Sequence, residues 1–104
     1  MTQATLARTF DKQPGESYPI AVEYENKLPS GTTLVSGTVS ARLLPGLTLD
    51  NSVLGSTNAT LDSTRLKVKV QAGTDGNDYK ITFLATLSDA SILEDDIVMR
   101  VRAL

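Results

Sequence analysis

The clearest pattern in the chain is an alternation of apolar and polar residues over two segments, 65–70 and 79–87. The apolar positions are Leu66, Val68 and Val70 on the first segment, and Tyr79, Ile81, Phe83, Ala85 and Leu87 on the second. A period of two places successive side chains on opposite faces of a strand. Residues 73–78 between the segments are Gly, Thr, Asp and Asn, which favour turns. The pattern predicts a hairpin-like pair of strands over residues 65–87.

Tyr79 opens the second segment, two residues before Ile81 and directly after a loop that contains Gly73 and Gly76. This arrangement resembles the tyrosine corner of immunoglobulin-like sandwiches, in which a Tyr two residues before a core position bonds to the backbone. We therefore expect Tyr79, Ile81, Gly73 and Gly76 to be structural residues.

Shorter segments with the same alternation are separated by turns along the rest of the chain. We expect strands at 16–25, 33–42, 47–50 and 96–103, weak pairing near 53–54 and 59–61, and a short edge strand at 9–11 that is anchored by Phe10. Pro19 lacks an N–H, which indicates that its strand is at an edge or starts pairing only after it. We expect Val35, Val39 and Ala41 to share the inward face of their strand with Gly37, which indicates a bulge or a close neighbour. Only residues 91–95 could form a helical turn.

These segments predict an all-β fold, an immunoglobulin-like antiparallel β-sandwich of about seven short strands. We expect its core to contain Val22, Val39, Val68, Ile81, Phe83, Met99 and Val101. We expect the sandwich to be a single domain over residues 9–104, preceded by a mobile N-terminal arm at 1–8. A chain of 104 residues is long enough to bury a core of its own.

Composition excludes several classes of function. The chain has neither Cys nor His, so it lacks disulfides, zinc-thiolate ligands and the commonest general base. We expect no enzyme activity, no catalytic residue and no cofactor. The formal net charge of −2 argues against a nucleic-acid partner. Because no apolar run has the length of a signal peptide or a membrane helix, we expect no membrane partner and synthesis in the cytoplasm without a signal peptide.

Several short motifs follow one another in a characteristic order. They are Lys12-x-Pro14-x-Glu16 before an aromatic-apolar strand, Leu28 and Gly31 in the next turn, Gly46-Leu47-Thr48, Gly73-x-x-Gly76-x-x-Tyr79, and Val101-Arg102. Their order and spacing resemble small immunoglobulin-like structural proteins of tailed bacteriophages, of the fibre–tail adaptor or virion structural type. The chain departs from that family at Glu23-Tyr24, where an Asp-Trp pair is common, and at Gln71-Ala72-Gly73, where a Ser-Gly-Gly turn is common.

The resemblance implies a structural component of the virion, made in the host cytoplasm. Such a protein would dock in several copies at the tail, the neck or the fibre attachment region. Its partners would be other virion proteins (tail, neck, fibre or major capsid protein) and copies of itself. One alternative is a capsid decoration protein, and another is a free carbohydrate-binding or adhesion module. The last is disfavoured because the chain has no Trp and its Tyr and Phe residues fall on inward positions or at the corner.

Four features are candidate sites. Asp75 and Asp78 could bind Ca²⁺ with loop carbonyls, although a plain turn explains the same residues. The outward cations Arg65, Lys67 and Lys69, with Lys80, could meet an acidic partner, but we favour the guarding of a strand edge. The acidic run 94–96 is typical of a solvated loop. We expect contacts with other virion proteins through Leu6 and Phe10 and through the loops around Pro14, Ser30 and Asp75.

Overall fold

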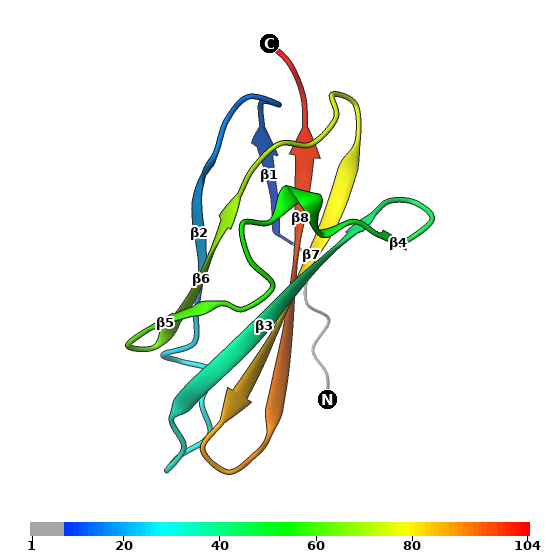
Figure 1. Ribbon diagram of the computed structural model, residues 1–104. Coiled ribbons are helices and arrows are strands. Elements are labelled where there is room, and N and C mark those ends of the chain that lie inside the picture. The colour runs from blue at the N-terminus through cyan, green and yellow to red at the C-terminus, as the bar shows by residue number, and fades with distance from the viewer. Residues whose placement is uncertain (1–7) are drawn as a thin grey trace.

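The computed structural model describes residues 8–104, which form two β-sheets and one short 3₁₀ helix (Figure 1). The elements are β1 (Arg8–Lys12), β2 (Tyr18–Glu23), β3 (Leu34–Leu43), β4 (Thr48–Leu49), η1 (Asn51–Val53), β5 (Thr60–Asp62), β6 (Arg65–Val70), β7 (Asp78–Leu87) and β8 (Ile92–Val101). One sheet has five strands in the order β1-β8-β7-β3-β4, and the other has three in the order β2-β6-β5. The predicted all-β sandwich is confirmed.

The predicted hairpin over residues 65–87 is wrong, because β6 and β7 lie in different sheets. β6 pairs with β2 and β5, whereas β7 pairs with β3 and β8. Both strands bury one complete apolar face, so they face each other across the core instead of lying side by side. Residues 71–77 are long enough to cross the ~10 Å between packed sheets. The sandwich is also not wholly antiparallel, since β1 runs parallel to β8 and sets Phe10 beside Met99.

The core lies between the two sheets and contains the residues that alternation placed there. The seven predicted core residues are at most 5% exposed: Val22, Val39, Val68, Ile81, Phe83, Met99 and Val101. They come from five strands and both sheets, so the predicted inward faces do meet in one core. Pro19 lies on β2, which is an edge strand as its missing N–H indicated.

Strand β3 contains the irregularity that Gly37 indicated. The pairing of β3 with β7 shifts register between Leu34 and Ser36, and a Cβ atom built on Gly37 would lie 2.3 Å from Leu66 Cδ1. Gly37 therefore combines a close contact between the sheets with a nearby bulge. The bulge changes the phase of the strand, so that Leu34 is buried and Val35 is 49% exposed, although we expected Val35 to face the core.

The last strand begins earlier than predicted. Residues 92–95 belong to β8 and pair with residues 83–86 of β7. Residues 91–95 therefore do not form the helical turn that was possible there, and the expected solvated loop at 94–96 is wrong. Asp95 points inward and is 8% exposed, because it keeps the alternation of the strand. The strand ends at Val101, two residues before the predicted end at residue 103, and Ala103 is exposed.

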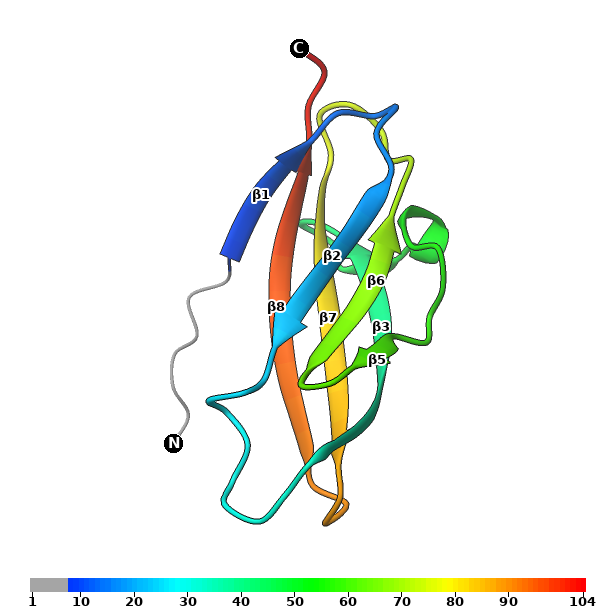
Figure 2. The same ribbon diagram turned by 90° about the vertical axis from the view of Figure 1, so that its left-hand side faces the viewer.

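Strand β1 is the short edge strand expected around Phe10. Arg8 pairs with Ile97 and so belongs to β1, whereas the remainder of the predicted arm, including Leu6, lies outside the described residues. The molecule measures 45 × 26 × 21 Å. The β1–β2 and β6–β7 connections lie at one end with the C-terminus, and the β2–β3 and β7–β8 connections lie at the other (Figure 2). The loops around Pro14 and Asp75 therefore share one end, and the loop around Ser30 lies at the opposite one.

Candidate functional site

Lys12 organises the end of the molecule that carries the C-terminus. Its side chain is only 1% exposed, and its ammonium Nζ donates to the carbonyl oxygens of Gln13 at 2.8 Å and Pro14 at 3.3 Å, and to that of Ala72. Burial lowers the pKa of Lys12, and the nearby carboxylate of Glu16 acts in the opposite direction. One buried cation thus ties the β1–β2 connection to the β6–β7 connection.

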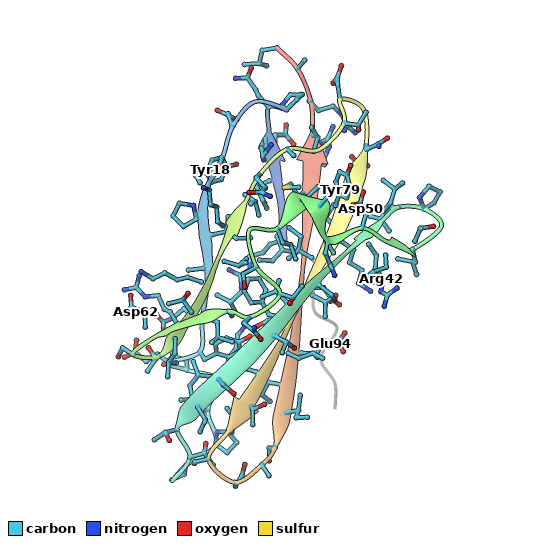
Figure 3. The ribbon with its side chains drawn as sticks, in the orientation of Figure 1. Tyr18, Arg42, Asp50, Asp62, Tyr79 and Glu94 are labelled. Atoms are coloured by element: carbon cyan, nitrogen blue, oxygen red, sulfur yellow. The ribbon has the colours of Figure 1, made fainter. Side chains whose placement is uncertain are left out.

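Tyr79, at the start of β7, packs under the same end of the sandwich (Figure 3). It is 2% exposed, and its hydroxyl accepts a hydrogen bond from the N–H of Thr74 at 3.4 Å. Gly73 has a φ of +94°, and a Cβ there would lie 2.8 Å from Val101 Cγ2. Gly76 has a φ of +92°, and its N–H donates to the carbonyl of Val101 at 2.8 Å. The loop is therefore held by backbone geometry and by bonds to the end of β8.

The two carboxylates that we considered for Ca²⁺ are used inside this loop. Asp75 Oδ1 accepts from the N–H of Ala103 at 2.9 Å, and Asp78 Oδ1 lies 2.8 Å from Arg102 Nη2. Arg102 also donates through Nη1 to the carbonyls of Asn77 and Val101. Within residues 8–104, no three acidic, His or Cys side chains gather as a metal site would require. These carboxylates join the loop to the C-terminal segment.

The cationic side chains of β6 do not guard an edge. β6 is the central strand of the three-stranded sheet, and Lys80 lies on β7 in the other sheet, so the four cations do not form one stripe. Arg65 Nε lies 3.1 Å from Glu23 Oε1 on β2, and Lys67 Nζ lies 2.9 Å from Asp62 Oδ2 on β5. The edge-guard interpretation is therefore wrong for β6, where cross-strand ion pairs link the central strand to both neighbours.

A second polar cluster lies toward the opposite end, between β2 and β8. Lys27 Nζ lies 2.6 Å from Asp95 Oδ2 and 5.4 Å from the centroid of the Tyr24 ring. The Tyr24 side chain is fully buried, and among the described residues its hydroxyl has no hydrogen-bond partner. Burial raises the pKa of Tyr24, and the negative charge of Asp95 adds to the effect. The ion pair links the β2–β3 connection to the inward carboxylate of β8.

The aromatic residues do not form an exposed sugar-binding platform. Tyr24, Tyr79 and Phe83 are buried, while Phe10 and Tyr18 are partly buried and their ring centroids lie 6.3 Å apart. Phe10, which we expected to contact a partner, packs on the core of its own domain.

Sequence reasoning missed the buried position of Lys12 and the inward position of Asp95. Each has a signal in the sequence, because Lys12 stands two residues after Phe10 and Asp95 two residues before Ile97, in the inward phase of their strands. A charged residue at an inward position of a strand indicates either a break in the strand or an oppositely polarised partner inside the fold. Here both charges have partners, which are backbone carbonyls for Lys12 and the ammonium of Lys27 for Asp95.

Within the described part of the chain, no helix is long and apolar enough to cross a membrane. No curated protein matches the chain. Residues 12–100 match the family described as Gp77, podophage GP4 fiber-tail adaptor protein gp77. The match begins at the buried Lys12, ends one residue before the last residue of β8, and includes both sheets. The chain therefore belongs to the Gp77 family of podophage fibre–tail adaptor proteins.

Proposed function

We propose that this protein is a non-enzymatic structural part of the virion that docks in several copies between the tail and a fibre. The match of residues 12–100 to the fibre–tail adaptor family carries the proposal. The partners that we infer are a tail or neck protein on one side and a fibre protein on the other.

The arrangement of the loops supports a bridging role. An adaptor has to contact two partners, and the candidate contact loops lie at the two ends of a domain that is 45 Å long. The end with Pro14 and Asp75 is stiffened by Lys12 and by the bonds of Asp75 to the C-terminal segment. Rigid loops lose little conformational entropy when they bind, so they suit a permanent contact.

We also propose that the sandwich is immunoglobulin-like. The three-stranded order β2-β6-β5 corresponds to strands B, E and D of such domains, and the order β8-β7-β3-β4 corresponds to G, F, C and C′. The crossing between sheets at residues 71–77, followed by Tyr79, fits the E–F corner of that topology.

Particles that lack this protein provide the direct test. We expect them to have filled heads and tails without attached fibres, and we expect purified protein added afterwards to restore fibre attachment and infectivity. A chain without residues 1–7 keeps β1 intact, so its addition separates a role of the N-terminal segment from the folding of the domain. Normal fibre occupancy without the protein would refute the adaptor proposal, and fragile heads with normal fibres would favour capsid decoration instead.

A further inference from the structure

The five-stranded sheet has an outer face, turned away from β2, β5 and β6, that other elements of residues 8–104 leave open. Arg42 and Glu94, both labelled in Figure 3, come from β3 and β8 on this face. It exposes two large apolar side chains near them, Ile92 at 64% and Leu49 at 53%. We name six residues of this face the outer patch: Leu49, Arg42, Lys80, Ile92, Glu94 and Asp96.

The sheet register places three residues of the outer patch in a row across the strands. Leu49 of β4 is the partner of Arg42 of β3, and Arg42 is in turn the partner of Lys80 of β7. Read across the sheet, the row is apolar, basic, basic. Neighbouring strands are ~4.8 Å apart, so the row measures about 10 Å from first to last.

The other three residues form a column along β8. Ile92, Glu94 and Asp96 alternate with the inward side chains of Leu93 and Asp95, so they project together from the outer face. Read along the strand, the column is apolar, acidic, acidic. Residues two apart on a strand are ~6.6 Å apart, so the column measures about 13 Å.

The row and the column complement each other in the same order. When two sheets pack with their strands at about 90°, a column of residues along a strand of one sheet lies over a row of residues across the strands of the other. If Glu94 of one copy lies over Arg42 of a second, then Ile92 lies over Leu49 and Asp96 over Lys80. The spacings differ by about 2 Å per step, which long side chains can absorb. A two-fold axis in the plane of contact repeats the same contacts with the copies exchanged, as an isologous interface requires.

Within residues 8–104, two of the four charges of the outer patch pair with each other and two have no ion-pair partner. The paired ones are Lys80 and Asp96, with Lys80 Nζ 3.7 Å from Asp96 Oδ2. Arg42 donates to the carbonyl of Leu47 at 3.4 Å and forms no ion pair within residues 8–104, and neither does Glu94. The two charges without an ion-pair partner in the described part of the chain are therefore the middle residue of the row, Arg42, and the middle residue of the column, Glu94.

We propose that two copies of this protein associate through the outer patch, with their five-stranded sheets face to face and their strands nearly perpendicular. The basic row and the acidic column of the outer patch match each other, so the patch is complementary to itself. This match favours a second copy of the chain as the partner, because binding to a different protein would not require it. The contact is small, so the dimer is weak in solution and gains strength where copies are held close together in a particle.

Charge reversal tests the proposal on the purified protein. Arg42→Glu and Glu94→Arg each place like charges at both middle contacts, and each should weaken dimerisation roughly tenfold in sedimentation equilibrium at low salt and up to about 1 mM protein. An equimolar mixture of the two variants, and the doubly reversed variant, should associate about as well as the original chain. Lys69→Glu on the other sheet makes the same change of charge as Arg42→Glu and should have no effect.

Three results would overturn the dimer: an original chain that stays monomeric throughout, single variants that associate as well as the original, or a mixture that associates no better than its components. Circular dichroism shows whether each variant keeps its strands, and all the altered side chains are on the surface. The measurement needs no tail or fibre, so a monomeric result would leave the adaptor proposal standing.

Discussion

Gly37 provides a test of how the two sheets pack. A methyl group at this position would lie 2.3 Å from Leu66 Cδ1 and 3.1 Å from the carbonyl oxygen of Leu84. Ordinary contact between carbon atoms is ~3.5–4.0 Å, so Leu66 has to move by more than an ångström, and overpacking of this kind costs about 1–3 kcal/mol. Ala restricts the unfolded chain more than Gly does, which returns ~0.5–1 kcal/mol. We expect Gly37→Ala to lower the free energy of unfolding by about 1–2 kcal/mol.

A double-mutant cycle isolates the contact between the sheets. Leu66 is fully buried, and Leu66→Ala alone should cost about 2–5 kcal/mol. In the double variant the new methyl group at position 37 enters space that Leu66 vacated, so the loss should be smaller than the sum of the single losses by ~1–2 kcal/mol.

Urea unfolding followed by circular dichroism measures all four chains. Gly15→Ala is the matched control, because nothing lies within 4 Å of a Cβ at that position, and it should be neutral or slightly stabilising. Strictly additive losses for Gly37 and Leu66 would refute the packing of β3 on β6.

Three further predictions concern the loop end and one surface carboxylate. Tyr79→Phe should lower the free energy of unfolding by at most about 1 kcal/mol, because the hydrogen bond between the hydroxyl and the N–H of Thr74 is long. Tyr79→Ala should lower it by ~3–5 kcal/mol, because it also removes packing of the ring. Equal losses for the two variants in urea melts would contradict this. Lys12→Met keeps the apolar stem but removes the donor from three carbonyls, and should lower the free energy of unfolding by ~1–3 kcal/mol; a neutral melt would show that the ammonium is dispensable. The pKa of Glu23 is lowered in the folded state, chiefly by the hydrogen bond from the Thr64 hydroxyl and to a smaller extent by the backbone N–H of Glu25 and the charge of Arg65. The ionised carboxylate therefore stabilises the fold at pH values above the unfolded pKa. This contribution is lost as the pH falls through the folded pKa. Thermal melts from about pH 5 downwards should therefore show a shallower loss of stability for Glu23→Gln than for the original chain, and an unchanged slope would contradict the assignment.

Alternation identified the strands and the core because burial on one face of a sheet leaves a period of two in the sequence. Val22, Val39 and Met99 were placed correctly on this basis alone. Alternation does not specify which strands are neighbours. β6 and β7 looked like a hairpin because they are adjacent in sequence with turn residues between them, but their apolar faces meet across the core.

Local irregularities and internal charges were harder to predict. One extra residue near Val35 reversed the phase of the first part of β3, and a bulge changes no residue type that would mark it. Lys12 and Asp95 are charged residues in inward phases, and their partners are distant in sequence, namely the carbonyl of Ala72 and the ammonium of Lys27. The fold class was accessible from the sequence, whereas these contacts required the tertiary structure.

The position of the protein in the particle tests the adaptor function most directly. Particles that carry a small electron-dense label at the C-terminus of this chain can be imaged by electron microscopy, because the C-terminal residue Leu104 is fully exposed. The adaptor function predicts several labels at the junction of tail and fibre and none on the head. Labels spread over the capsid surface, or the absence of label from infectious particles, would contradict it.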